Sequence, residues 1–245
     1  MRTIDSWTEF LPLASPYMMA CVQTENYSRG WQLAHGAAVL VQGENEYRLL
    51  IDGDCTPLEY VRILSEAVNS STPAASANVP FALAEKLKPE KARDWFYLER
   101  TSPRAKLALP AECTLVRPGQ MDQEISRFLQ LNASDSSVVP GNPEIDFWIV
   151  AHNSENEIIA TAAGTTWSSG TKIVASVAVG INARRQGWGS VVTMLALQQQ
   201  FDLGASTVGL GVRGSNTGAV EMYRSLGFEN EFHYSGIRLI TTDLQ

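Results

Sequence analysis

The second half of the chain shows short apolar runs broken by polar turns. Three consecutive runs, IDFWIVAH (145–152), IIATAAGTTW (158–167) and KIVASVAVGI (172–181), are rich in β-branched and aromatic residues, a composition that is typical of strands. The polar turn NSENE separates the first two runs. We therefore expect an antiparallel meander of three strands.

The residues before this meander predict one more strand and a helix. CTLVRP (113–118) is a strand candidate. Residues 121–131 have helical periodicity, with Ile125, Phe128 and Leu129 on the inward face. The polar segment 132–144 contains two prolines, which favour a loop or a broken helix.

After the meander, strands and helices alternate. A helix is predicted over 190–203, where Gly204 is its stop signal. STVGLGV (206–212) predicts a strand, 216–226 a helix, and FHYSGIRLITT (232–242) one or two further strands. This order indicates an α/β or α+β fold with a mixed, mostly antiparallel twisted sheet that is flanked by helices.

The first half also reads as a run of regular elements. AAVLVQGENEYRLLIDG (37–53) predicts a hairpin, because two β-rich runs flank a Gly-Glu-Asn-Glu turn. The small-residue segment SSTPAASANVP (70–80) favours a linker or mobile loop. One or two short helices are predicted over 81–93, with an interruption at Pro89, and a strand over 95–101.

Residues 56–68 predict the clearest helix of this half. Thr56 stands at the N-cap and Pro57 at the first helical position. The apolar residues at helical spacing are expected to face the core. They are Leu58, Val61, Leu64 and Val68.

A proline-punctuated segment, TSPRAKLALPAE (101–112), separates the two halves. We place a domain boundary near residue 108, which gives an N-terminal α/β domain over 1–108 and a second domain over 109–245. The first domain carries no chemical motif of its own. Its hairpin-then-helix order permits a degenerate copy of the second domain.

Composition limits the classes of function. With 44% hydrophobic residues the 245-residue chain can bury a core. Three scattered cysteines suggest neither disulfides nor a zinc site, and the opening MRTIDSWTEF does not read as a secretory signal. No apolar stretch is long enough to span a membrane. We expect a cytoplasmic protein without a membrane partner.

Charge points away from nucleic acid. The net charge is −7 and the sequence pI is about 5.0, so a phosphate backbone is not the expected partner. Residues from 111 onward carry 8 basic and 13 acidic side chains. This excess of acid suits a cationic substrate, although it is also a common solubility feature.

The stretch RRQGWGSVV (184–192) predicts an anion site. Two arginines and two glycines stand between a strand and the start of a helix. Such a junction has unpaired backbone N–H groups and the positive end of the helix dipole, and glycines let a ligand approach closely. The alternative is a plain turn at a helix start.

Two familiar phosphate motifs do not fit this junction. A P-loop needs a Gly-Lys-Ser/Thr sequence, and no lysine is present in the loop. A dinucleotide fingerprint needs a third glycine where Val192 stands, and an acidic residue after the next strand, where Val212 and Arg213 stand.

The loop and the segment that follows it resemble the Gcn5-related N-acetyltransferase (GNAT) family. The family's loop reads Arg/Gln-x-x-Gly-x-Gly/Ala, which Arg184, Gly187 and Gly189 match. LGVRGSNTGAVEMYRSLGF (210–228) matches the family's second element in order and spacing. The resemblance covers roughly residues 113–245. Ile181 and Arg185 depart from the common proline and glycine, and Trp188 replaces a small aliphatic residue.

The resemblance implies a coenzyme A site. The pyrophosphate would be held by backbone N–H groups, with charge from Arg184 or Arg185. Those N–H groups belong to Gln186, Gly187, Trp188, Gly189 and Ser190. The pantetheine would pair with the exposed backbone of the central strand, at Val177, Ala178 and Val179. Asn216 would contact the coenzyme, against the alternative of simple helix capping.

The resemblance also implies direct attack of an amine on the thioester, without a covalent enzyme intermediate. A backbone N–H of the central strand would stabilise the oxyanion. Tyr223 would protonate the leaving thiolate, although a tyrosine that anchors the helix is the alternative reading. Many members of the family place a glutamate on the central strand as the base, but this strand carries no carboxylate, and Ser176 is its only polar side chain in the middle. The base therefore stays open between a water relay, Glu221, Asp146 and the first domain.

We therefore expect an N-acetyltransferase that moves an acetyl group from acetyl-CoA to a primary amine on a small molecule or peptide. The alternative is a coenzyme A-binding regulatory module with weak or lost turnover. No metal is expected, because His35, His152 and His233 do not have ligand spacing. A homodimer is a possible assembly.

Overall fold

The structure is a computed structural model that describes residues 1–43, 46–68, 74–101 and 108–239. The elements up to residue 101 are β1 (Arg2–Ile4), α1 (Trp7–Phe10), η1 (Leu11–Leu13), α2 (Pro16–Cys21), β2 (Tyr27–Gln32), β3 (His35–Gln42), β4 (Tyr47–Asp54), α3 (Pro57–Val68), β5 (Ala74–Pro80), α4 (Phe81–Leu87) and β6 (Ala92–Arg100). The elements that follow are β7 (Cys113–Val116), α5 (Asp122–Asn132), β8 (Ile145–His152), β9 (Ile158–Thr166), β10 (Lys172–Val179), η2 (Ile181–Ala183), α6 (Trp188–Asp202), β11 (Val208–Arg213), α7 (Thr217–Ser225) and β12 (Asn230–Arg238).

The chain forms two compact units that interleave along the sequence. Unit 1 comprises Met1–Tyr97, Val212–Thr217 and Phe232–Gln245, and unit 2 comprises Leu98–Gly211 and Gly218–Glu231. This division differs from a single boundary near residue 108. Most of β12 belongs with the N-terminal elements.

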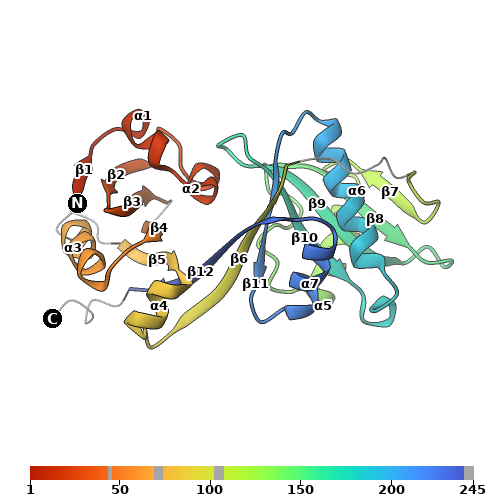
Figure 1. Ribbon diagram of the computed structural model, residues 1–245. Helices are drawn as coiled ribbons and strands as arrows, with labels where there is room; N and C mark the ends of the chain where they lie inside the picture. Colours follow the sequence, from red (N-terminus) through yellow and green to blue (C-terminus); the bar gives the residue numbers. More distant parts are fainter. Residues whose placement is uncertain (44–45, 69–73, 102–107, 240–245) are drawn as a thin grey trace. The chain divides into compact units, whose positions relative to one another are not determined.

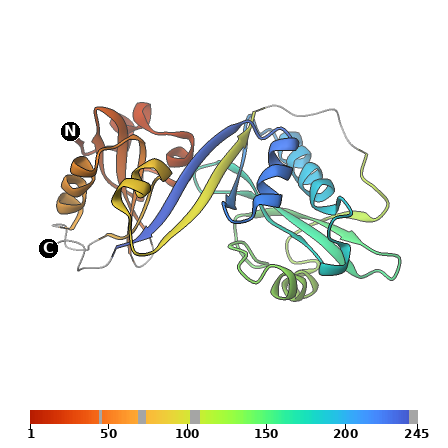
Figure 2. The same ribbon diagram turned by 60° about the horizontal axis from the view of Figure 1, so that its bottom comes forward.

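Unit 2 contains the predicted meander. β7, β8, β9 and β10 pair antiparallel in this order, and β11 pairs parallel to β10. Figure 1 shows α6 lying along these strands, and the turned view in Figure 2 shows α5, in green, and α6, in light blue, on opposite faces of the sheet. The expected mixed, mostly antiparallel sheet with flanking helices is confirmed.

α5 and α6 each bury apolar residues against one face of the sheet of unit 2. The predicted inward residues of α5, Ile125, Phe128 and Leu129, are buried, and they pack with Trp148 of β8. α6 buries more of its circumference against the sheet. Its buried residues are Val192, Thr193, Met194, Leu195, Ala196, Leu197 and Gln200. None of the helices in the described ranges combines the length and the apolar character needed to cross a membrane.

In unit 1 the predicted hairpin is confirmed. β3 and β4 pair antiparallel from His35 opposite Asp54 to Gln42 opposite Tyr47. The expectation of a linker over 70–80 is wrong for the part that the structure describes, because β5 is a strand between β4 and β12. Hydrogen bonding on both sides stabilises a strand whose small residues have little strand propensity of their own. Residues 70–73 lie outside the described ranges.

The helix over 56–68 is confirmed, but its expected inward face is wrong. Leu58 and Val61 are 63% and 56% exposed, whereas Leu64 is buried; the side chain of Val68 lies outside the described set. The face that packs on β3, β4 and β5 follows the i, i+3, i+4, i+7 spacing. It consists of Tyr60, Ile63, Leu64 and Ala67.

The same order of elements occurs in both halves of the chain. β3, β4, α3, β5 and α4 form an antiparallel pair, a helix, a strand parallel to the second, and a short helix. β9, β10, α6, β11 and α7 repeat this order. The first half therefore has the element order of a degenerate copy of the second, which the sequence permits.

Candidate functional site

The central feature of the site is the point where β10 leaves β11. The parallel register between these strands consists of Lys172 opposite Val208 and Ile173 opposite Gly209. Within the described residues β10 continues to Val179 without a further partner on this side. Strand N–H and C=O groups that lack a neighbouring strand can pair with an extended ligand.

β10 also carries a bulge on its other side. Its register against β9 shifts between Ala175, which faces Ala163, and Ala178, which faces Thr161. Two residues of β10, Ser176 and Val177, therefore stand opposite one of β9, and such an extra residue bends a strand and increases its twist. The bulge lies next to the predicted pantetheine positions, Val177, Ala178 and Val179.

The predicted anion loop follows β10 directly. The chain makes the single 3-10 turn η2, and Arg184 is extended. Arg185 and Gly187 then have positive φ values of 64° and 87°. A side chain disfavours this backbone conformation and glycine does not, so Gly187 suits the left-handed residue that turns the chain into α6.

The N-terminus of α6 lacks a side-chain cap. Gly187 is the N-cap and no side chain accepts a hydrogen bond from the first turn. The first backbone bond of the helix runs from the Val191 N–H to the Gly187 carbonyl, at 3.1 Å. The N–H groups of Trp188, Gly189 and Ser190 precede this bond, so they and the positive end of the helix dipole are available to an anion.

The side chains around this loop add positive charge without a carboxylate partner in the described residues. Arg184 and Arg185 are both exposed. The Arg184 Nε donates to the Val179 carbonyl at 3.3 Å, which ties the loop to the end of β10. Gln186 Nε2 donates to the Asn182 carbonyl at 3.0 Å, so the predicted contribution of Gln186 would come from its backbone.

The second glycine of the loop lies against α7. A Cβ built on Gly189 would lie 3.2 Å from Met222 Sδ and 3.5 Å from Val179 Cγ2. Glycine therefore allows α7 to pack closely on the start of α6. This contact brings the helix that carries Tyr223 to the loop.

Tyr223 is buried on α7 beside Phe228, with ring centroids 5.8 Å apart in an edge-on arrangement. Desolvation by burial raises its pKa well above the usual value of about 10. The phenol therefore keeps its proton at neutral pH. Its hydroxyl makes no hydrogen bond to the described residues.

Asn216, the last predicted coenzyme contact, precedes α7. Its N–H donates to the Arg213 carbonyl at 3.0 Å. Because residues 212–217 group with unit 1 and the loop with unit 2, the predicted role of Asn216 stays a prediction.

Of the two acids that the sequence left open as bases, Asp146 is bound in a polar network. Its carboxylate accepts a hydrogen bond from Thr166 Oγ1 at 2.6 Å, and Lys172 Nζ lies 3.6 Å away. Lys172 is five residues from Val177 along β10, a distance of about 16 Å at the usual strand rise. The contacts of Asp146 therefore lie at the opposite end of β10 from Val177, and Glu221 is exposed on α7.

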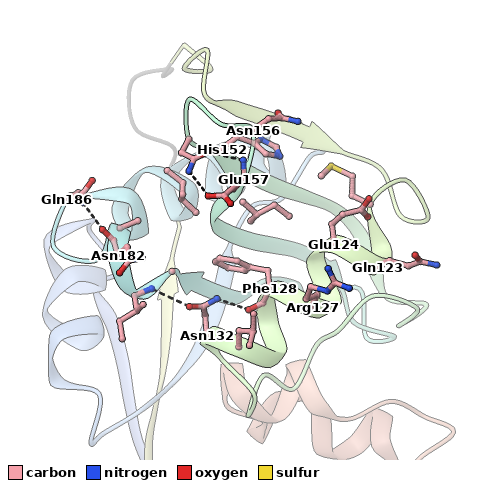
Figure 3. A pocket seen from close by; sticks show the side chains of 18 residues that line it. Gln123, Glu124, Arg127, Phe128, Asn132, His152, Asn156, Glu157, Asn182 and Gln186 are labelled. Atoms are coloured by element: carbon pink, nitrogen blue, oxygen red, sulfur yellow. Dashed lines mark hydrogen bonds between the residues drawn. The ribbon is translucent and has the colours of Figure 1, made fainter.

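A groove borders the loop on the α5 side of the sheet (Figure 3). Its volume is about 910 Å³, and it runs between α5, the β8–β9 turn and residues 180–186. Asn132 bridges two walls: its Nδ2 donates to the Phe128 carbonyl at 2.9 Å, and its Oδ1 accepts from the Ile181 N–H at 3.3 Å. Sequence reasoning missed this groove, because its residues share no motif and meet only in the folded chain.

The described residues contain no group of three or more His, Cys, Asp or Glu side chains that could hold a metal ion.

His233 makes polar and stacking contacts in unit 1. Its Nε2 contacts Asp94 Oδ1. Its ring stacks on the rings of Phe81 and Phe96, with distances between ring centroids of 4.0 and 4.1 Å.

Comparisons with known proteins agree with these features. The model of the acetyltransferase (GNAT) family matches residues 92–228. A GNAT-family acetyltransferase from Colwellia psychrerythraea is similar over 97% of this chain and 99% of its own, with a TM-score of 0.57 and 12% identity. A GCN5-related N-acetyltransferase from Kribbella flavida is similar over 88% of this chain and 92% of its own, with a TM-score of 0.56 and 22% identity. At such identities the structures show the fold alone. No curated protein matches the sequence.

Proposed function

The chain belongs to the acetyltransferase (GNAT) family, and on this premise we propose that it transfers an acetyl group from acetyl-CoA to a primary amine. The family match spans more than half of the chain and includes the loop, β10 and α7. The observation that carries the proposal is the uncapped start of α6 behind the left-handed Gly187.

The diphosphate of the coenzyme suits this helix start for electrostatic reasons. The backbone N–H groups of residues 186–190 and the dipole of a 15-residue helix favour a negative ligand. Arg184 and Arg185 bring positive charge to the same loop. Gly187 leaves open space above the backbone, since a Cβ there would meet nothing within 4 Å.

The pantetheine arm would lie along the unpaired edge of β10. Its two amides can pair with the backbone of residues 177–179 as an added strand would. The contact uses main-chain atoms, so it is compatible with the apolar side chains of Val177, Ala178 and Val179. The thioester would then lie at the bulge, where a β10 N–H group can stabilise an oxyanion.

The proposed reaction is a direct attack. The amine nitrogen forms a bond to the thioester carbon and the carbonyl oxygen takes negative charge. When this intermediate collapses, the C–S bond breaks and the coenzyme leaves as a thiolate. Tyr223 gives its proton to the sulfur and the amine loses a proton to water. The Tyr223 phenolate then takes a proton back from water before the next turnover. Burial makes Tyr223 a weak acid, but the same desolvation also raises the proton affinity of a thiolate.

A second candidate is a coenzyme A-binding regulatory module without turnover. The lack of a carboxylate on β10 favours it, as does the engagement of Asp146 with Thr166 and Lys172. Both candidates share the coenzyme site. They differ in whether a thiol is released.

Substitution of Tyr223 separates the two candidates. We expect Tyr223→Phe to keep its affinity for coenzyme A and to lose about 10²-fold or more in kcat, as is usual when a general acid is removed. The measurement is free-thiol release from acetyl-CoA across a panel of small-molecule and peptide amines. Tyr60→Phe is the control, because Tyr60 is an equally buried helical tyrosine in unit 1.

Three results distinguish the acid role of Tyr223 and the two candidate functions. Loss of rate in Tyr223→Phe but not in Tyr60→Phe supports the acid role. Full activity in Tyr223→Phe removes that role. Wild-type protein that binds coenzyme A but releases no thiol with any amine favours the regulatory module.

A further inference from the structure

We propose that Ser176 is a positioning residue for the acetyl transfer, because it fixes the β10 bulge by tying it to segment 133–142. The inference rests on the proposed function, since it concerns how the strand edge at 177–179 is aimed. It assigns no proton transfer to Ser176.

The backbone of Ser176 is the first observation. Its φ is +49°, a left-handed conformation that a non-glycine residue rarely adopts in the middle of a strand. Such a conformation persists only where neighbouring groups hold it. Ser176 sits at the register shift between Ala175 and Ala178, so its conformation is what creates the bulge.

Two hydrogen bonds hold this conformation. The Ser176 hydroxyl donates to the Val138 carbonyl. The Thr161 hydroxyl, from β9, donates to the Ser176 carbonyl at 3.3 Å. The first bond joins β10 to a segment outside the sheet, and the second joins it to the neighbouring strand.

The position of Val138, which accepts the first hydrogen bond, is fixed by core packing. Its side chain is buried in the core cluster that contains Ile125, Phe128 and Trp148. The carbonyl that accepts the hydrogen bond from Ser176 is therefore held by the packing of α5 on the sheet. Moving the bulge would require moving this core residue or breaking the bond.

The position of the bulge explains why this matters for catalysis. β10 loses its pairing with β11 after Ile173, so pairing on that side does not hold residues 174–179. On the other side, the bulge interrupts the pairing with β9. The Ser176 contacts thus set where the backbone of residues 177–179 faces. A displacement of about 1 Å in such a position can cost about 10²-fold in rate.

Ser176 is not placed to act as a base. Its hydroxyl proton is directed at a carbonyl, and no histidine or carboxylate of the described residues hydrogen-bonds to it. Its effect must therefore pass through the geometry of the strand. This distinguishes it from the carboxylate that the resemblance leads one to expect on this strand.

The test uses three variants, of which Thr161→Val and Thr165→Val are a matched pair. Ser176→Gly keeps the left-handed backbone but removes the hydroxyl. Thr161→Val removes the bond to the Ser176 carbonyl, and Thr165→Val is its control. Thr161 and Thr165 are both fully buried on β9, and Thr165 Oγ1 donates to a β10 carbonyl in the same way, to Ile173 at 3.5 Å, but ahead of the bulge.

We expect Ser176→Gly to lower kcat about tenfold or more, with the Kd for coenzyme A changed less than about threefold, because the loop holds the coenzyme. Thr161→Val should lower kcat in the same direction, and Thr165→Val should not. The backbone is read directly by hydrogen exchange. Amides 174–180 should exchange faster in Ser176→Gly, and amides 184–190 should not.

Failure of the positioning role and failure of the proposed function give different results. If kcat and exchange at 174–180 are unchanged in Ser176→Gly, or if Thr165→Val matches Thr161→Val, the positioning role is wrong. If the wild type transfers no acetyl group to any amine, the proposed function itself fails, and the exchange data still show whether Ser176 holds the bulge.

Discussion

One glycine precedes α6 and another follows it, and both have the left-handed backbone conformation. Gly187 precedes the helix with φ +87°, and Gly204 follows it with φ +90°. A Cβ on either would meet nothing within 4 Å, so both positions demand glycine for backbone reasons alone. They differ in that only Gly187 lies in the proposed diphosphate loop.

This pair gives a residue-scale prediction. Gly187→Ala and Gly204→Ala should each lower stability by about 1–2 kcal/mol, because alanine is strained at positive φ. Only Gly187→Ala should also weaken coenzyme A binding, by about tenfold or more. Thermal unfolding and titration calorimetry of both variants check this. Equal coenzyme affinity in the two variants would remove Gly187 from the site.

The raised pKa of Tyr223 predicts a pH effect on stability. Above pH 10 an unfolded chain ionises its tyrosines, whereas the buried Tyr223 keeps its proton. The free energy of unfolding then falls as pH rises, by at most about 1.4 kcal/mol per pH unit for one proton. Below pH 10 this contribution is fully present.

Tyr223→Phe should therefore flatten the alkaline loss of stability. Denaturant unfolding at pH 9 and pH 11 measures the difference between the wild type and the variant. We expect the advantage of the wild type to shrink by about 1 kcal/mol at pH 11. Tyr17 and Tyr234, whose pKa values are also raised by burial, contribute equally to both proteins. Parallel curves would show that Tyr223 ionises normally.

At the scale of elements, the two equivalent helix starts differ in chemistry. α3 follows β4 as α6 follows β10, but its N-terminus is already satisfied. The Glu59 N–H donates to Thr56 Oγ1 at 3.2 Å, and the Thr56 N–H donates to Glu59 Oε2 at 3.0 Å, which is a capping box. Pro57 has no N–H to offer. The hydrogen bond from the Thr56 backbone lowers the pKa of Glu59, so this start keeps a negative charge.

The chain should therefore bind one coenzyme, at α6 and not at α3. Titration calorimetry should give a stoichiometry near one per chain. Thr56→Ala should lower the free energy of unfolding by about 1 kcal/mol through the lost cap and leave the coenzyme affinity unchanged. A stoichiometry near two would show that α3 also binds the ligand.

Elements differ in how well local pattern predicts them. The meander and the inward face of α5 follow directly from periodicity, and they are confirmed. α3 has apolar residues on two faces, and only the packing on β3–β5 selects Tyr60 and Ile63 over Leu58 and Val61. β5 has a linker's composition, and its strand exists because β4 and β12 pair with it.

At the scale of the whole molecule, the candidate site also consists of parts that local sequence pattern predicts and parts that it does not. The loop and the helix starts are local, so the glycine spacing around Gly187 and the motif around Tyr223 predict them. The end of the β10–β11 pairing, the Ser176 bulge and the assignment of β12 to unit 1 depend on residues far apart in sequence. A local sequence motif identifies a turn of small residues, but it does not identify the register between two strands.

The most direct test of the account is hydrogen exchange of the whole chain with and without coenzyme A. The central claim is that main-chain N–H groups at the start of α6 hold the diphosphate. Amides 186–190 should exchange slowly once the coenzyme is bound, whereas amides 54–60 at the start of α3 should not change. Coenzyme binding that leaves amides 186–190 exchanging as in the free protein, or no binding at all, would contradict the account.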